Sequence, residues 1–347
     1  MNRRFLLAAL ILLGWLAVPS RCPAPLVYRP GEGWTYESAG GGGKWVRARA
    51  KDQLDVAQEA FDKKQYGLAK KAARRTVKRW PLSDYAPQAQ YLLARVYEAK
   101  KYDQRAFKEY QTLIEKYPKA TNYDEVLHRQ YEIANRFLAG QWFKLWGVIP
   151  FFPSMEKTAD MFAKIIRNGP YTDIAPEAQL KIGTAREKQK EYPLAVRAYE
   201  RAADVYHDNV KFAAEALYRA GLAWQKQAQT AEYDQSAAAS AISTFTDFAT
   251  LYPTDKRVPG TQKIIASLKT EQSRGAYEVA KFYEKKRKWD GAKVYYSEAV
   301  SRDPGSIYAA EARQRLEVLA RITRTKNPAA TNAPPAAPTA PAAPAAR

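Results

Sequence analysis

The stretch from Trp80 to Ala89, W-P-L-S-D-Y-A-P-Q-A, recurs in similar form at two later places in the chain. Gly169–Ala178 has the sequence G-P-Y-T-D-I-A-P-E-A, and Asp303–Ala312 has D-P-G-S-I-Y-A-A-E-A. All three fit the pattern P-x-[ST]-x-x-A-x-x-A. Proline stops one helix, Ser or Thr suits the start of the next, and spaced alanines suit a packed helix face. The recurrence therefore predicts repeated helices, with this stretch at the junction between units.

The helices beside each junction share a second pattern. A small residue is followed four positions later by a large or aromatic residue, and proline comes twelve positions after the small one. Ala106, Tyr110 and Pro118 form one such copy. This is the tetratricopeptide pattern, in which small residues let two antiparallel helices approach closely and aromatic residues fill the space between units. The other small positions of the second helices are Ala69, Ala195, Ala241 and Ala292, with a weaker copy at Ala159, and those of the first helices are Ala57, Ala94, Gly183 and Ala280.

The pattern predicts an all-α fold, a tetratricopeptide-repeat superhelix of about five to six helix-turn-helix units over residues 47–325. Good helix formers fill most positions, and strand alternation is nearly absent. One unit cannot bury its apolar face alone, so the units must stack, leaving a concave wall made mainly by first helices. Uneven spacing predicts inserts at Gly140–Ser154 and Gln225–Ala239.

Residues 1–21 predict a secretory signal peptide. A basic start precedes the apolar run Phe5–Val18, which is too short to span a bilayer comfortably. The mature chain is therefore expected outside the cytoplasm. Cys22, the only cysteine, stands where a bacterial lipoprotein carries its lipid, although Arg21 departs from the usual small residue there. Cleavage by ordinary signal peptidase after Ser20 is the alternative.

The two ends of the mature chain lack a periodic apolar pattern. Residues 22–46 contain several prolines and four consecutive glycines, which predicts a flexible tether. Residues 326–347 are mostly Ala and Pro, which predicts a disordered tail. The net charge of +20 suits an acidic partner, an anionic membrane surface or nucleic acid, or simply a solvated surface. The signal peptide argues against nucleic acid.

Motifs for catalysis are missing from the sequence. There are two histidines and one cysteine, with no H-E-x-x-H, no C-x-x-C, no phosphate-binding glycine loop and no G-x-S-x-G. Neighbouring carboxylates such as Asp124 and Glu125 stand where they favour the start of a helix. We therefore expect no enzyme activity, no cofactor and no metal site.

Three features suggest binding instead. The insert in the third unit is rich in aromatic residues, including Trp142 and Trp146, which suits a docking surface or, alternatively, a local core. A basic run with an adjacent tryptophan suits an acidic partner or lipid headgroups, or a solvated turn. This run comprises Lys285, Lys286, Arg287, Lys288 and Trp289. By repeat register, the concave wall is expected to present Lys51, Gln58, Tyr91, Arg95, His128, Tyr131 and Asn135.

Several segments resemble the BamD family, periplasmic lipoproteins of the bacterial machinery that assembles outer-membrane β-barrels. Arg79–Asp103, which ends K-K-Y-D, and Glu115–Ala120, E-K-Y-P-K-A, are similar to the repeat junctions of that family. Tyr277–Asp290, Y-E-V-A-K-F-Y-E-K-K-R-K-W-D, resembles its late helix-turn-helix, and the long third unit agrees. The resemblance covers about residues 50–322. Arg21 and the Ala/Pro tail depart from it.

The resemblance implies a non-catalytic scaffold at the periplasmic face of the outer membrane. Such a scaffold binds the barrel-inserting subunit through its C-terminal units and unfolded outer-membrane protein clients through its N-terminal units. Cys22 would be the lipid attachment site. The alternative is another periplasmic tetratricopeptide scaffold that coordinates cell-envelope or division proteins. That family usually carries an N-terminal coiled coil, and Pro23–Gly43 has no heptads.

Overall fold

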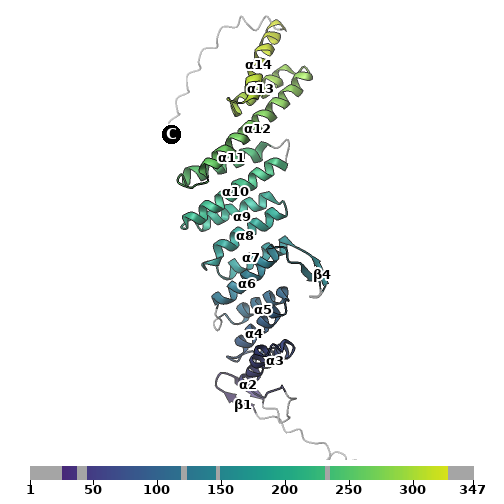
Figure 1. The fold of residues 1–347 in the computed structure, drawn as a ribbon, viewed down its shortest axis with the longest axis vertical. Coiled ribbons are helices and arrows are strands. Elements are labelled where there is room, and N and C mark those ends of the chain that lie inside the picture. The colour runs from purple at the N-terminus through teal and green to yellow at the C-terminus, as the bar shows by residue number, and fades with distance from the viewer. Residues whose placement is uncertain (1–25, 37–44, 119–122, 146–148, 231–234, 327–347) are drawn as a thin grey trace, which may run out of the picture. The chain divides into compact units, whose positions relative to one another are not determined.

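The computed structural model describes residues 26–36, 45–118, 123–145, 149–230 and 235–326 (Figure 1). The chain divides into two compact units, the N-terminal unit Met1–Ala175 and the C-terminal unit Pro176–Arg347. Helices account for nearly all regular structure in the described ranges, which confirms the predicted all-α tetratricopeptide fold. The predicted signal peptide lies outside these ranges, and so does the predicted tail apart from Lys326.

Two short hairpins and thirteen helices make up the described structure. The hairpins are β1 (Leu26–Arg29) with β2 (Gly33–Tyr36) and β3 (Phe143–Leu145) with β4 (Ile149–Phe152). The helices of the N-terminal unit are α2 (Ala50–Asp62), α3 (Tyr66–Arg79), α4 (Ala86–Ala99), α5 (Asp103–Lys116), α6 (Tyr123–Leu138) and α7 (Met155–Asn168). The boundary between the two units falls within α8 (Ile174–Lys188). The later helices are α9 (Tyr192–Val205), α10 (Val210–Thr230), α11 (Gln235–Leu251), α12 (Val258–Lys285), α13 (Trp289–Arg302) and α14 (Ile307–Lys326).

Consecutive helices pack in pairs, as the repeat register predicts. In the N-terminal unit α2 packs on α3, α4 on α5 and α6 on α7, and each pair also contacts the next. In the C-terminal unit α9 to α14 pack in chain order. The predicted alanines of the second helices are fully buried or nearly so, because these are the points of closest helix approach. The large residues four positions later that are fully buried are Tyr110, Tyr199, Phe245 and Tyr296.

The three junctions contain the same kind of hydrogen bond, which explains why all three copies of the opening pattern have a hydroxyl residue. Ser83 Oγ donates to the carbonyl of Trp80 at 3.0 Å, and Thr172 Oγ1 donates to that of Gly169 at 2.7 Å. Ser306 Oγ donates to the carbonyl three residues before it at 2.9 Å. Ser306 also accepts from the backbone N–H of Ala309 at 3.1 Å and so caps α14 as predicted. Ser83 was predicted to cap α4 and does not, since α4 begins three residues later, at Ala86.

Four turns between paired helices contain a basic residue in the left-handed backbone region. Their φ angles are 58° at Lys64, 58° at Lys101, 62° at Lys190 and 56° at Arg287. In the second of these turns the N–H of Tyr102 donates to the carbonyl of Tyr97 at 2.9 Å, which is the hydrogen bond of a Schellman motif. The position normally favours glycine, because a Cβ atom clashes with the backbone there.

We expect Lys101→Gly to raise the free energy of unfolding by about 0.5–1 kcal/mol, since it relieves this clash. The matched control is Lys100→Gly, one residue earlier, where φ is −85° and glycine brings only extra freedom to the unfolded chain. That control should lower the free energy of unfolding by up to about 1 kcal/mol. Urea denaturation followed by circular dichroism measures both. A loss of stability in both variants would contradict the prediction.

The N-terminal hairpin corrects the prediction of a flexible tether over residues 22–46. Its described part, Leu26–Tyr36, pairs β1 with β2 in antiparallel register. The backbone N–H of Asp84 donates to the carbonyl of Gly31 at 2.7 Å, and Glu32 is buried. The N–H of Lys51 donates to the Glu32 carboxylate at 3.4 Å. The hairpin is therefore held against the start of α2 and the junction after α3.

A buried tyrosine joins three consecutive helices at three places. Tyr110 donates to Glu98 at 2.9 Å, and both Tyr199 to Glu187 and Tyr296 to Glu284 do so at 2.6 Å, each across twelve residues. The following helix supplies a cation to each carboxylate. These cations are Arg129 at 3.6 Å from Glu98, Lys226 at 2.9 Å from Glu187, and Arg315 in contact with Glu284. Each glutamate thus binds its own helix pair to the next helix.

None of the helices within the described ranges combines the length and the apolar character needed to cross a membrane.

Candidate binding sites on the two units

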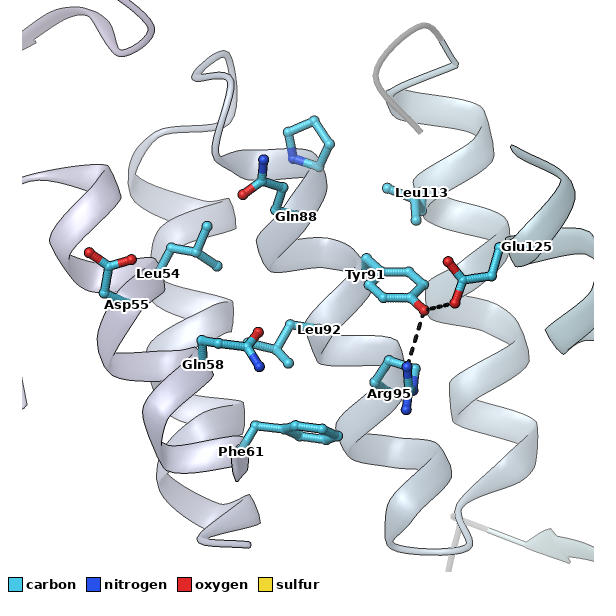
Figure 2. A pocket seen from close by; sticks show the side chains of 11 residues that line it. Leu54, Asp55, Gln58, Phe61, Gln88, Tyr91, Leu92, Arg95, Leu113 and Glu125 are labelled. Atoms are coloured by element: carbon cyan, nitrogen blue, oxygen red, sulfur yellow. Dashed lines mark hydrogen bonds between the residues drawn. The ribbon is translucent and has the colours of Figure 1, made fainter. Parts of the chain in front are cut away.

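A groove of about 530 Å³ lies on the N-terminal unit between α2 and α4 (Figure 2). Its floor is apolar, since Leu54, Leu92 and Leu113 are almost fully buried. Its rim is polar and exposed, with the Asp55, Gln58 and Gln88 side chains. The remaining lining residues, from α2, α4 and α6, are Phe61, Pro87, Tyr91, Arg95 and Glu125.

Helical spacing explains why these side chains share a face. Leu54, Gln58 and Phe61 are four and three positions apart on α2, and Tyr91 and Arg95 are four apart on α4. Figure 2 shows Gln58 and Phe61 extending from α2 toward α4. The Arg95 guanidinium lies 5.8 Å from the ring centroids of both Phe61 and Tyr91. The two aromatic rings therefore hold the cation inside the groove.

A hydrogen-bond network fixes the α6 side of the groove. The Tyr91 hydroxyl donates to the Glu125 carboxylate and accepts from Arg95 at 3.2 Å and from Arg129 at 3.0 Å. Arg129 also donates to Glu125 at 3.0 Å. The Tyr91 hydrogen bond, followed by those from Arg129, lowers the pKa of Glu125 below its usual value. Glu125 is therefore charged at neutral pH, and the network keeps Tyr91 in place.

The chemistry of the groove suits an extended polypeptide. The leucine floor and the aromatic rings can bury apolar side chains, and the amides of Gln58 and Gln88 can pair with backbone groups. Arg95 can bind a carboxylate or a carbonyl oxygen, and Asp55 offers an acceptor at the rim. None of the residues that line the groove is a Ser, Thr, Cys or His. Within the described residues there is also no group of three His, Cys, Asp or Glu placed to hold a metal ion.

A second, more open hollow of about 700 Å³ lies on the C-terminal unit, around the end of α12. Phe282 is 59% exposed, and the ammonium group of Lys286 lies 5.8 Å from its ring centroid. The basic run supplies three of the lining residues, and Trp289 among them also packs against the core of this unit. The lining of this C-terminal hollow comprises Tyr277, Glu278, Lys281, Phe282, Glu284, Lys285, Arg287, Trp289, Tyr296 and Arg315.

The structure brings together only part of the predicted wall. Gln58, Tyr91 and Arg95 line the groove. Lys51 is exposed but does not line it, and His128 lies 3.5 Å from Asp173 instead. Asn135 is half-buried on α6 and Tyr131 is buried, and neither lines the groove. The Tyr131 ring packs edge-on against Phe162 with 5.8 Å between centroids, so it belongs to the core.

The aromatic insert contributes to a local core and also leaves one described tryptophan exposed. Phe143 is buried and stacks on Phe137 with ring centroids 4.2 Å apart, which makes a local core. Trp142 is 52% exposed. Trp146 lies outside the described residues. The described part of the insert contains the hairpin of β3 and β4.

Sequence reasoning missed the whole groove floor and part of its rim. Phe61 and Gln88 lie three positions from predicted members of the wall, so helical spacing alone would have found them. Leu113 comes from the second helix of its pair, and nothing local in the sequence indicates that it reaches the groove. In the C-terminal hollow Lys285 and Arg287 were predicted, whereas the lining cations Lys281 and Arg315 and the exposed Phe282 were not.

The comparison with protein families supports the resemblance that the sequence showed. Residues 153–324, just under half of the chain, match the model described as YfiO, outer membrane lipoprotein. Residues 88–120 match a tetratricopeptide-repeat model. The resemblance to the BamD family is confirmed. Both this family and the repeat fold are associated with scaffolds for protein interactions. Among curated proteins none matches the chain.

Several solved structures match the chain at low identity and low TM-score. The C-terminal part of a repeat-containing protein from Cytophaga hutchinsonii is 16% identical, with 76% of this chain and 87% of that one covered and a TM-score of 0.33. A tetratricopeptide protein from Parabacteroides merdae is 12% identical, with 78% and 98% covered and a TM-score of 0.31. MamA from Desulfovibrio magneticus is 12% identical, with 60% and 97% covered and a TM-score of 0.31.

Proposed function

We propose that this chain is a non-catalytic scaffold at the periplasmic face of the bacterial outer membrane. It takes part in the assembly of β-barrel proteins, holds unfolded client segments and binds the barrel-inserting subunit. The observation that carries this proposal is the groove on the N-terminal unit, in a chain whose later part matches an outer membrane lipoprotein family. Attachment through a lipid on Cys22 belongs to the proposal.

The groove is assigned to the client segment. An unfolded β-strand offers alternating apolar and polar side chains together with unpaired backbone groups. The groove supplies a matching leucine floor, the amides of Gln58 and Gln88, and Arg95. Because such contacts are not sequence-specific, one groove can accept many clients.

The C-terminal hollow is assigned to the barrel-inserting subunit. Its exposed cations and Phe282 suit an acidic surface with an apolar centre. Tyr277, at its edge, donates to Glu311 at 2.6 Å, and burial followed by this hydrogen bond raises its pKa to about 12. The hydroxyl therefore stays protonated at physiological pH, so the positive charge of the hollow is not offset by a phenolate.

Affinity isolation of the tagged chain from envelope membranes, with mass spectrometry of the bound proteins, tests this function. The wild type should recover the barrel-inserting subunit and β-barrel precursors. The double variant Lys285→Glu/Lys286→Glu should lose the barrel-inserting subunit and keep the precursors. The groove variant Arg95→Glu should lose the precursors and keep the subunit. Recovery of division or peptidoglycan proteins without the barrel-inserting subunit would refute the proposal in favour of a different envelope scaffold.

A further inference from the structure

The N-terminal hairpin presents two aromatic rings to solvent. Tyr28 and Trp34 face each other across β1 and β2, with ring centroids 5.3 Å apart. They are 59% and 67% exposed, although each is large enough to be buried at a substantial gain. The turn of the hairpin is hydrogen-bonded to the rest of the unit through Gly31 and Glu32. These contacts hold the aromatic pair on the surface of the unit.

The junction after α3 adds an aliphatic residue and positive charge to the same region. Leu82 is 95% exposed and lies two residues before Asp84, whose N–H binds the hairpin tip. Lys78 and Arg79, at the end of α3, are both exposed. In the described structure neither cation has an ion pair with a carboxylate, and α3 carries six cations and no acidic residue.

The chain length upstream of the hairpin limits how far this region can be from a membrane anchor. Tyr28 lies six positions after Cys22, and a fully extended chain of that length spans about 20 Å. A lipid on Cys22 would therefore keep Tyr28 within roughly this distance of the bilayer surface. Tryptophan and tyrosine are the residues that favour the headgroup level, and lysine and arginine favour anionic lipid phosphates.

We propose that Tyr28, Trp34 and Leu82 form a membrane-contacting patch that inserts among the headgroups of an anionic bilayer, with Lys78 and Arg79 against the lipid phosphates. This rests on the proposed outer-membrane location but not on the groove. A lipid chain alone gives marginal binding, and a second contact of this kind makes it stable and orients the unit.

Site-specific fluorescence on vesicles tests the patch. In the mature chain with Cys22→Ser, single cysteines are introduced by Trp34→Cys, Leu82→Cys or Tyr171→Cys and labelled with a polarity-sensitive dye. Tyr171 is the matched control, because it follows the proline of the second junction as Leu82 follows that of the first, and is 99% exposed. Vesicles of phosphatidylethanolamine and phosphatidylglycerol should shift the emission to the blue at positions 34 and 82 and leave position 171 unchanged.

The affinity of variants for the same vesicles is a second test of the membrane-contacting patch. The triple variant Tyr28→Ser/Trp34→Ser/Leu82→Ser should bind these vesicles roughly tenfold more weakly, and Tyr171→Ser should bind like the wild type. Equal emission shifts at all three labelled positions, no vesicle binding, or a triple variant that binds like the wild type would overturn the proposal. Client-peptide binding by the triple variant is measured alongside. That value reports on the groove alone, so failure of the patch is distinguishable from failure of the proposed function.

Discussion

Gly183→Val is expected to lower the free energy of unfolding of the C-terminal unit by roughly 3 kcal/mol. A Cβ atom at this position on α8 would lie 2.3 Å from a ring carbon of Tyr199 and 2.6 Å from two others. The ring has no room to move, because it is fully buried and its hydroxyl is bound to Glu187. Valine must therefore push the helices apart at their closest approach. Circular dichroism during urea denaturation measures the loss.

Gly260→Val is the matched control for this change. Gly260 lies in the same unit, near the start of α12, and a Cβ atom there would meet nothing within 4 Å. This variant should stay within about 0.5 kcal/mol of the wild type. In a double-mutant cycle, Tyr199→Leu should recover part of the loss caused by Gly183→Val, since it removes the atoms that clash. Strictly additive losses would show that the contact with Tyr199 is not the cause.

Arg95→Glu is expected to weaken binding of an unfolded β-strand peptide at least about tenfold. Arg95 is the one cation among the residues that line the groove, and Asp55 and Glu125 already supply two carboxylates. The variant removes the cation held between Phe61 and Tyr91 and leaves the groove strongly negative. Fluorescence anisotropy with a labelled synthetic peptide from a porin strand measures the affinity.

Lys51→Glu separates a specific contact from a general effect of charge. It makes the same change of two charge units in the N-terminal unit, at an exposed residue that does not line the groove. Its affinity for the peptide should stay within about twofold of the wild type. If both variants lose affinity to the same extent, the peptide is held by the overall positive charge and not in the groove. Circular dichroism verifies that both variants are folded.

The repeat register was predictable because helix contact requires small side chains at fixed intervals. Ala106 and Ala292 are buried at the expected places for this reason. The inward faces were harder to assign, since an error of one residue turns a side chain by about 100° around the helix. Tyr131 shows this: it was predicted on the binding wall and packs in the core against Phe162.

The N-terminal hairpin was not predictable from its own residues. Its strands are four residues each, and contacts with Lys51 and Asp84, distant in sequence, hold it in place. The glutamate–tyrosine pairs could have been predicted. Glu98 and Tyr110 have the same separation as the two later pairs, so an alignment of the copies with one another would have revealed them.

The cation that each glutamate–tyrosine pair receives from the next helix gives the array a direction. The glutamate of each pair has its cation only when the following helix is present. A break between pairs therefore leaves a partly buried carboxylate without its cation. Helix α14 has no partner helix after it among the described residues, yet it supplies Arg315 to Glu284. It therefore supplies the cation that completes the pair of Glu284 and Tyr296. Forms shortened or lengthened within the described helices should fold stably only when whole repeats are removed or added and α14 is kept.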